Sequence, residues 1–315
     1  MEKLNIVYMG TPMFSVGPLK ELIKEHNVCL VVTQPDKKVG RKQEIMFSPV
    51  KEEAIKNNIE VFQPTNIRED YKVILDKNPD MIVTCAYGQI IPKILLEYPK
   101  YKCINIHASL LPKYRGGAPI HHSIINGDEY TGITIMYMDT KMDSGDILFQ
   151  EKEKIEDFDN VGTMFTKLSE LGSKMINPSI EKIVNGLVTP IKQNEEEVSF
   201  AYNISKEDEL LDFNRNTIEV FNKIRGLNPF PVAYVILDNK RVKIFESRII
   251  NSNKTGRIGE IIDVYDDGLG VKTLDGEIVL TCIQFEGKKR TSVKDYLNGI
   301  QNKNELLGKV FNLQE

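Results

Sequence analysis

Two polar residues, Asn105 and His107, stand out in the otherwise apolar run Cys103–His107. Side chains alternate between the two faces of a β-strand, so residues two apart lie on the same face. An imidazole can transfer a proton near neutral pH, and a carboxamide can donate hydrogen bonds. The pair is therefore a candidate for chemistry. The plainer alternative is structural, with His107 bonded to a backbone carbonyl and Asn105 capping a turn, and at this point both interpretations stay open.

Two turn-rich segments follow this pair. Residues 109–119 form a loop whose prolines restrict the chain and whose Gly116 and Gly117 let the backbone come close to another group. Further along, Asp143 lies in a D-x-G turn between two strand patterns. Such a turn commonly does no more than reverse the chain. Taken singly, neither segment identifies a site.

The first half of the chain alternates short apolar runs with segments of helical period. This alternation predicts an α/β fold with a Rossmann-like, mostly parallel sheet and helices on both faces. Ligands bind at the carboxyl ends of the strands in such sheets, which is where Asn105 and His107 lie. Gly10-Thr11-Pro12 follows the first strand in place of G-x-G-x-x-G, so we expect no dinucleotide site. The expected strands are 4–9, 28–33, 61–62, 81–86, 103–107, 132–138 and 146–151, and the expected helices are 14–25, 50–57, 67–77 and 161–186.

The pattern changes after residue 188. Residues 189–205 are polar and weakly periodic, and we assign them to a linker between an N-terminal domain, 1–188, and a C-terminal domain, 206–315. One helix, 217–225, opens the second domain. Short strands separated by turns then predict a small antiparallel β-barrel. These strands are expected at 233–237, 242–250, 259–264, 270–273 and 277–283.

The composition is that of an ordinary globular chain of 315 residues, with 41% apolar residues, 27% charged residues and a net charge of −4. This acidic balance argues against non-specific binding of nucleic acid by the whole surface, but it is compatible with a local basic patch. The four cysteines form no C-x-x-C pair, so we expect reduced cysteines. No segment approaches the ~18 apolar residues of a membrane span. We therefore expect a cytoplasmic protein without membrane contact.

Considered together, the motifs are specific. NIHASLLPKYRG at 105–116, followed by MDSGD at 142–146, resembles the signature of the 10-formyltetrahydrofolate-dependent formyltransferases. The resemblance implies an N-terminal formyltransferase domain and a C-terminal β-barrel of OB-like type. It is most detailed for the family members that act on methionyl-tRNA. It extends over most of the chain, through GTP at 10–12, TQPD at 33–36, SPVK at 48–51, AYG at 86–88, GITIM at 132–136 and NPFP at 228–231.

The resemblance implies that Asn105, His107 and Asp143 are catalytic. Formyl transfer from N10 of the folate to an amine passes through a tetrahedral intermediate that bears an oxyanion. Asn105 can donate a hydrogen bond to that oxygen, and a protonated His107 can add positive charge. Asp143 would favour the imidazolium and could position a water that relays the proton from the attacking amine. No covalent enzyme intermediate is expected.

The resemblance also implies where the co-substrate, 10-formyltetrahydrofolate, binds. It would lie against two loops at the carboxyl edge of the sheet, chiefly through backbone groups. No metal is expected, because His121 and His122 are adjacent and lack the spacing of a helical metal pair. The residues expected to bind the folate are Tyr87, Gly88, Gln89, Ile90, Ser109, Leu110, Leu111 and Pro112.

A basic segment, residues 36–47, bears on which substrate carries the amine that accepts the formyl group. By charge alone it would be a solvated loop. In the family members that formylate initiator methionyl-tRNA, an insertion here enters the end of the acceptor stem, and Arg41 matches its key arginine. The resemblance therefore implies a tRNA partner held through phosphate contacts, and a monomeric enzyme. The residues expected to contact tRNA are Lys37, Lys38, Arg41, Lys42 and Lys206.

Other functions fit parts of the pattern. An N-formyltransferase acting on an amino-sugar nucleotide could use the same three residues beside a different C-terminal domain. Hydrolysis of 10-formyltetrahydrofolate would use water as the acceptor and leave the basic segment unexplained. A folate- or RNA-binding module without turnover is disfavoured by the complete set of Asn105, His107 and Asp143. The basic segment and the SPVK match favour tRNA as the acceptor.

Overall fold

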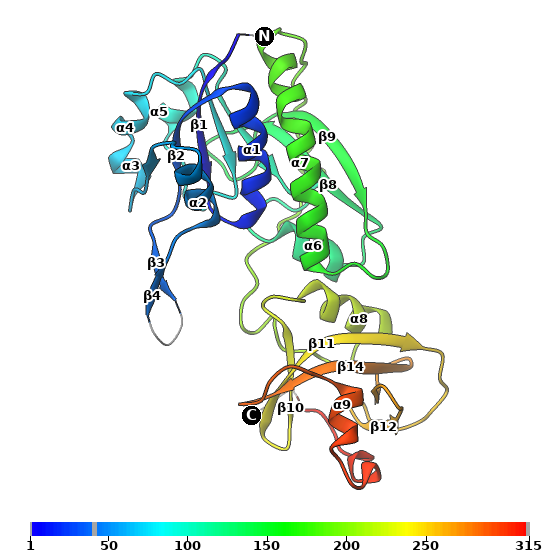
Figure 1. The fold of residues 1–315 in the computed structure, drawn as a ribbon. Coiled ribbons are helices and arrows are strands. Elements are labelled where there is room, and N and C mark those ends of the chain that lie inside the picture. Colours follow the sequence, from blue (N-terminus) through cyan, green and yellow to red (C-terminus); the bar gives the residue numbers. More distant parts are fainter. Residues whose placement is uncertain (1, 40–42, 313–315) are drawn as a thin grey trace. The chain divides into compact units, whose positions relative to one another are not determined.

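The computed structural model describes residues 2–39 and 43–312, which divide into two compact units (Figure 1). The first unit holds the described residues of Met1–Pro119, Tyr130–Lys154 and Phe165–Tyr202. The second holds those of Ile120–Glu129, Ile155–Met164 and Asn203–Glu315. Two stretches that precede the expected domain boundary at residue 188 thus belong to the second unit.

Within the described part of the first unit, seven strands form one sheet in the order β5-β2-β1-β6-β7-β8-β9. The five strands from β5 to β7 are parallel, and β8 and β9 continue the sheet antiparallel. The prediction of a mostly parallel, Rossmann-like sheet is confirmed. The strands are β1 (Asn5–Gly10), β2 (Asn27–Val32), β5 (Val61–Phe62), β6 (Met81–Cys85), β7 (Cys103–His107), β8 (Tyr130–Tyr137) and β9 (Ile147–Lys154).

Helices cover both faces of this sheet. On one face lie α1 (Val16–Glu25) and α7 (Val161–Val184), and Gly172 of α7 comes so close to the sheet that a Cβ there would be 3.1 Å from Ile106. The other face is covered by α3 (Ile67–Asp70), α4 (Lys72–Leu75) and α5 (Lys93–Glu97). The buried side chains between them include Val7, Met9, Ile67, Ile74, Ile82, Leu95 and Cys103.

Two helix predictions have different outcomes. The prediction for α2 (Pro49–Lys56) is confirmed, and Ser48 caps it by accepting a hydrogen bond from the Lys51 N–H. The single helix expected at 67–77 is wrong, because α3 and α4 are separate. Tyr71 between them has ψ of −15°, which is closer to 3₁₀ than to α-helical geometry and interrupts the regular turn.

The described residues of the second unit contain an antiparallel sheet in the order β10-β11-β14-β13-β12, with β15 paired to β14. All five expected strands are present. The C-terminal segment closes the sheet, because Asn312 pairs with Ile236 of β10 and Val310 pairs with Glu260 next to β12. Exposed strand edges invite association, and this pairing protects both. The strands are β10 (Ala233–Leu237), β11 (Lys240–Ile250), β12 (Ile261–Val264), β13 (Leu269–Lys272), β14 (Glu277–Phe285) and β15 (Thr291–Ser292).

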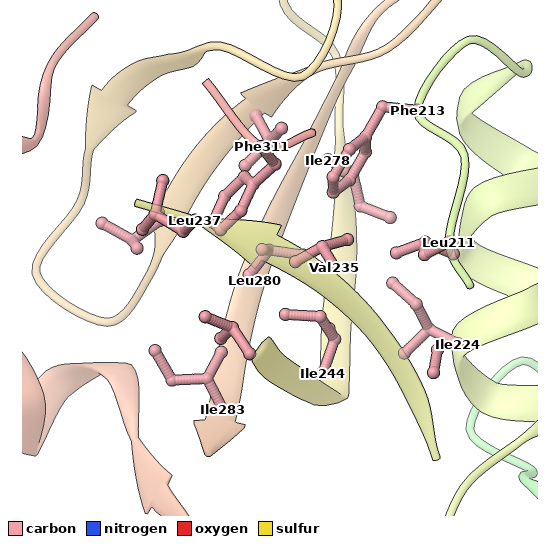
Figure 2. Close-up of a cluster of buried hydrophobic side chains, with 14 of the residues drawn as sticks. Leu211, Phe213, Ile224, Val235, Leu237, Ile244, Ile278, Leu280, Ile283 and Phe311 are labelled. Carbon is pink, nitrogen blue, oxygen red and sulfur yellow. The ribbon is translucent and has the colours of Figure 1, made fainter. Parts of the chain in front are cut away.

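One hydrophobic core holds the second unit together. Figure 2 shows Ile224 of α8 (Thr217–Gly226) facing side chains of β10, β11 and β14, with Phe311 from the C-terminal segment among them. α6 (Pro119–Ile125) and α9 (Val293–Asn298) complete the helices. Along residues 2–39 and 43–312, no helix combines the length and apolar character needed to cross a membrane.

Candidate active site

Asn105 and His107 lie at the carboxyl end of β7, near the middle of the sheet. Asn105 is opposite Thr84 of β6 on one side and Met136 of β8 on the other. Ile106 faces α7, whereas Cys103 packs into the cluster under α5. Because alternate residues share a face, Asn105 and His107 lie on the Cys103 side.

Asn105 is held in one orientation by a neighbouring strand. It is 9% exposed, and the Thr84 hydroxyl donates to its Oδ1 at 2.8 Å. Since Oδ1 accepts this bond, the Nδ2 group is the part of the amide that can donate to a ligand. Thr84 is not among the residues predicted from the sequence, although the hydroxyl in the apolar run MIVTC is a usable signal.

The two ring nitrogens of His107 have different surroundings. Nε2 lies 2.9 Å from the carbonyl oxygen of Tyr114. A carbonyl oxygen only accepts, so Nε2 carries a hydrogen. Nδ1 lies 3.7 Å from Oδ2 of Asp143, within ion-pair range but beyond a hydrogen bond. The backbone partner expected from the plainer interpretation therefore exists, and it leaves Nδ1 facing a carboxylate.

Asp143 is fixed through both its backbone and its side chain. Its φ is +49°, which is a left-handed conformation uncommon for a residue with a Cβ. Its Oδ2 accepts a hydrogen bond from the Gly116 N–H at 2.8 Å. Gly116 has φ of +127°, and a Cβ at this position would be 2.6 Å from the Ala201 oxygen, so glycine is required there. The D-x-G turn thus positions a carboxylate beside His107 as well as reversing the chain.

The loop at 109–112 is held by hydrogen bonds of its own. The Ser109 hydroxyl donates to the Lys113 carbonyl at 2.7 Å, and the Ser109 carbonyl accepts from Thr134 at 2.6 Å. Leu111 is buried, with its carbonyl accepting from Gln150 at 2.7 Å. The Ser109 hydroxyl is therefore occupied by a hydrogen bond within the protein, and the Leu111 side chain is packed in its interior. Among the four residues expected to bind folate here, Leu110 and Pro112 are the partly exposed ones.

The loop after β6 ends at the same edge of the sheet, because β6 and β7 are parallel neighbours. Tyr87 is buried, and the Gln89 carboxamide donates to the Pro64 carbonyl and accepts from the Ile67 N–H. Gly88 and Ile90 are the exposed members of this group. Of the eight residues expected to bind folate, few can thus meet a ligand through their side chains, and binding through their backbone groups stays a prediction.

The basic segment contains a β-hairpin, so the prediction of a loop over 36–47 is wrong for its two ends. β3 (Lys37–Val39) and β4 (Glu44–Met46) form an antiparallel pair, in which the backbone N–H and C=O groups of one strand hydrogen-bond to those of the other. Lys37 and Lys38 are exposed. Arg41 and Lys42 lie outside the described residues. Lys206 is exposed and belongs to the second unit, whereas the hairpin belongs to the first.

Family models match both parts of the chain. A model described as formyl transferase matches residues 4–180, and one described as formyl transferase, C-terminal domain, matches residues 203–301. The chain therefore belongs to the formyl transferase family. The resemblance found in the motifs at 105–116 and 142–146 is confirmed at the level of the family.

Individual relatives indicate which members of the formyl transferase family this chain resembles in sequence. The chain is 48% identical over 300 residues to methionyl-tRNA formyltransferase of Bacillus thuringiensis subsp. konkukian, a match that covers 94% of this chain and 96% of the relative. The enzyme of the same name from Bacillus cereus strain AH820 matches with the same identity and coverage. This chain thus falls among the methionyl-tRNA formyltransferases.

Solved structures with the same fold are more distant in sequence. An N-formyltransferase from Helicobacter canadensis, crystallised with folinic acid and dTDP-3-aminofucose, superposes with a TM-score of 0.69 at 21% identity, covering 88% of this chain and 98% of that one. HypX from Aquifex aeolicus in complex with tetrahydrofolic acid gives 0.66 at 16% identity, covering 95% of this chain and 47% of that one. These two similarities show the fold alone.

Proposed function

We propose that this chain transfers the formyl group of 10-formyltetrahydrofolate to the α-amine of initiator methionyl-tRNA. The observation that supports it most directly is the His107–Asp143 pair, with Nδ1 and Oδ2 at 3.7 Å, beside Asn105 on one face of β7. The 48% identity to methionyl-tRNA formyltransferases supports the acceptor. The N-formyltransferase from Helicobacter canadensis, crystallised with a sugar nucleotide, is more distant, at 21% identity, and so supports the sugar-nucleotide alternative less.

Asn105 and His107 would act on the carbonyl oxygen of the formyl group. When the amine nitrogen attacks the carbon, negative charge develops on this oxygen. The Nδ2 group of Asn105 donates to it, with the amide held by Thr84, so no reorientation is needed during the reaction. A protonated His107 would add positive charge near this oxygen, and the Asp143 carboxylate lies 3.7 Å from its Nδ1.

Asp143 would also assist the transfer of a proton from the attacking amine to N10 of the folate. The attacking amine must lose one proton, and N10 of the folate must gain one as its bond to the formyl carbon breaks. The Asp143 carboxylate is 15% exposed, which leaves it accessible to one water that accepts from the amine and donates to the leaving nitrogen. No acyl-enzyme forms in this scheme, since the formyl carbon passes directly from one nitrogen to the other.

The loops at the carboxyl edge suit the polar ring of a folate. Ala86 and Gly88 are exposed and have positive φ, with values of 48° and 90°. The exposed backbone at Ala86 and Gly88 would pair with a heterocycle, whereas the carbonyl oxygen of Tyr87 between them already accepts hydrogen bonds from Thr11 and Gln34. Pro112 and the internal hydrogen bonds of the loop at 109–112 would keep its backbone in place for the same ligand.

We further propose that the basic hairpin and Lys206 contact the tRNA backbone. Lys37 and Lys38 are exposed on β3, and Ile45 of the paired strand is 64% exposed, which offers an apolar surface next to the charges. Arg41 and Lys42 enter this proposal from their charge and the family resemblance. Since each phosphate contact releases counterions, the Kd for tRNA should rise with salt concentration.

A monomeric cytoplasmic enzyme is the simplest setting for this site. Asn105, His107 and Asp143 all come from one chain, which is compatible with a monomer. All four cysteines lie within the described residues and are free, which suits a reducing compartment. Sedimentation of the purified protein at micromolar concentration would test the oligomeric state.

The acceptor is tested by offering three compounds side by side: initiator methionyl-tRNA, the same tRNA without methionine, and an amino-sugar nucleotide. We expect formylation of initiator methionyl-tRNA alone. Without this acceptor, the release of formate from 10-formyltetrahydrofolate should be slow. Preferential formylation of the sugar nucleotide would refute the proposed acceptor. Fast formate release without any acceptor would indicate a hydrolase.

The chemistry is tested with Asp143→Asn, and Asp139→Asn in the same loop is the matched control. Asp139 is exposed and bonds to its own neighbour, Thr140. We expect kcat to fall about 10²–10⁴-fold for Asp143→Asn and to stay unchanged for the control. Near-normal kcat in Asp143→Asn, with both substrates still bound, would remove Asp143 from the mechanism.

A further inference from the structure

Residues 191–201, which the sequence pattern assigned to a linker, cross the active-site loops of the first unit. We call this segment the site strap. Ile191 pairs with Ile147 of β9 through two backbone hydrogen bonds of 2.8 and 2.9 Å. At the other end, Phe200 pairs with Arg115 of the loop after β7. The strap is therefore anchored on both sides of the turn that carries Asp143.

Gln193 of the strap closes this turn. Its Nε2 donates to the carbonyl oxygens of Asp143 and Gly145, both at 2.8 Å. Asp143 has φ of +49°, and a left-handed residue with a Cβ costs about 1–2 kcal/mol. Two hydrogen bonds of about 1 kcal/mol each offset that cost. The backbone of Asp143 is thereby held where its carboxylate faces His107.

Arg115 fixes the orientation of Gln193. It is 4% exposed, and its Nε donates to the Gln193 Oε1 at 3.0 Å. Because Oε1 accepts from a guanidinium that can only donate, the amide cannot flip, and Nε2 must point to the turn. Glu195 completes the chain of contacts by accepting from Nη2 of Arg115 at 2.9 Å, so the buried charge has a counterion.

The same loop also holds the carboxylate itself. Gly116, next to Arg115, donates its N–H to Oδ2 of Asp143 at 2.8 Å. The backbone of Asp143 is thus bound by the strap, and its side chain is bound by the loop to which the strap is paired. Moving the strap would displace both contacts together.

We infer that Gln193, oriented by Arg115, is a positioning residue that sets the place of the Asp143 carboxylate relative to His107. This inference rests on the proposed catalytic role of Asp143. A carboxamide is required at position 193, because the residue must donate to two carbonyls while accepting from an arginine. The strap therefore belongs functionally to the active site and acts through Asp143.

Gln193→Met keeps the length of the side chain and removes its polar atoms. We expect kcat to fall about tenfold to hundredfold, since only part of the contribution of Asp143 is lost, with KM for both substrates within about threefold. Gln284→Met is the matched control, because Gln284 also donates to a backbone carbonyl, that of Lys288, in a hairpin of the second unit. Its kcat should be unchanged.

A double-mutant cycle separates positioning from a general loss of structure. If Gln193 acts through Asp143, Gln193→Met should lower kcat no further in an Asp143→Asn background. Multiplicative effects would overturn the inference, as would unchanged kcat in Gln193→Met while Asp143→Asn is impaired. Full activity of Asp143→Asn alone would instead refute the proposed mechanism. Circular dichroism of each variant checks that it is folded. Gln193→Glu gives a second test, because a carboxylate cannot donate hydrogen bonds to the carbonyl oxygens of Asp143 and Gly145.

Discussion

Replacing Thr84 with valine tests whether the orientation of Asn105 matters for catalysis. The Thr84 side chain is 2% exposed, and its hydroxyl lies 2.8 Å from Oδ1 of Asn105. Valine has nearly the same shape, so packing against the sheet is preserved. The change removes the hydroxyl of Thr84 and leaves the buried Oδ1 of Asn105 without its hydrogen-bond donor. The amide of Asn105 is then free to rotate and present either atom to a ligand.

Two magnitudes follow from this geometry. Leaving a buried acceptor without its donor lowers the free energy of unfolding by about 1–3 kcal/mol. Removing an oxyanion donor altogether lowers kcat by about 10²–10³-fold. Because Thr84→Val only loosens that donor, we expect a loss of about tenfold, equivalent to about 1.4 kcal/mol of transition-state stabilisation. The loss should appear equally in kcat and kcat/KM, since the bond to the oxyanion forms only in the transition state.

The assay is the initial rate of methionyl-tRNA formylation, together with urea unfolding followed by circular dichroism. Thr131→Val is the matched control: Thr131 is also 2% exposed, and its hydroxyl has no hydrogen-bond partner in the described parts of the chain. We expect the control to keep both its stability and its kcat. Wild-type kcat in a folded Thr84→Val protein would refute the idea that Thr84 orients the amide of Asn105 for catalysis.

Three further predictions concern other parts of the chain. Phe311→Ala should lower the free energy of unfolding of the second unit by about 3–5 kcal/mol, because this 6% exposed ring fills the barrel core; a change below about 1 kcal/mol in urea denaturation would contradict it. Burial raises the pKa of the Cys85 thiol to about 12, so thiol reagents at about pH 8 should label it only after unfolding; rapid labelling seen by peptide mapping would be inconsistent. The hydrogen bond from Arg115 lowers the pKa of Glu195 below 4.5, so its stabilising contribution is present above that value and disappears as pH falls through the lowered folded pKa. The difference in Tm between wild type and Glu195→Gln should therefore be seen at about pH 6 and diminish below about pH 4, and a difference that grows on acidification would refute the assignment.

The local pattern of the chain was sufficient for the layout of the fold. Short apolar runs located the seven strands of the first sheet, since strands covered by helices on both faces are apolar throughout. Short runs separated by turns located the five main strands of the barrel. The alternation of side chains along a strand placed Asn105 and His107 on one face. The motifs at 105–116 and 142–146 then indicated the family, which the family models confirm.

The basic segment and the region after residue 188 show where local patterns stop being informative. Charge alone suggested a loop at 36–47, yet its ends pair as β3 and β4. Low periodicity alone suggested a linker at 189–205, yet residues 191–201 are bound to the loops of the site. In both cases the structure comes from pairing with another segment, which a short window of sequence does not contain.

What the sequence by itself determined is the set of residue types and the strand that carries two of them. What only the tertiary structure decided is their mutual arrangement. Asp143 is 36 positions beyond His107 in the sequence, and its carboxylate comes within 3.7 Å of the imidazole because Gly116 and Gln193 bind its turn from two sides. Thr84 reaches Asn105 because β6 and β7 are neighbours in the sheet. Such contacts depend on strand order and on the paths of loops, and these are settled by the burial of the whole chain, which the periodicity of a single segment does not encode.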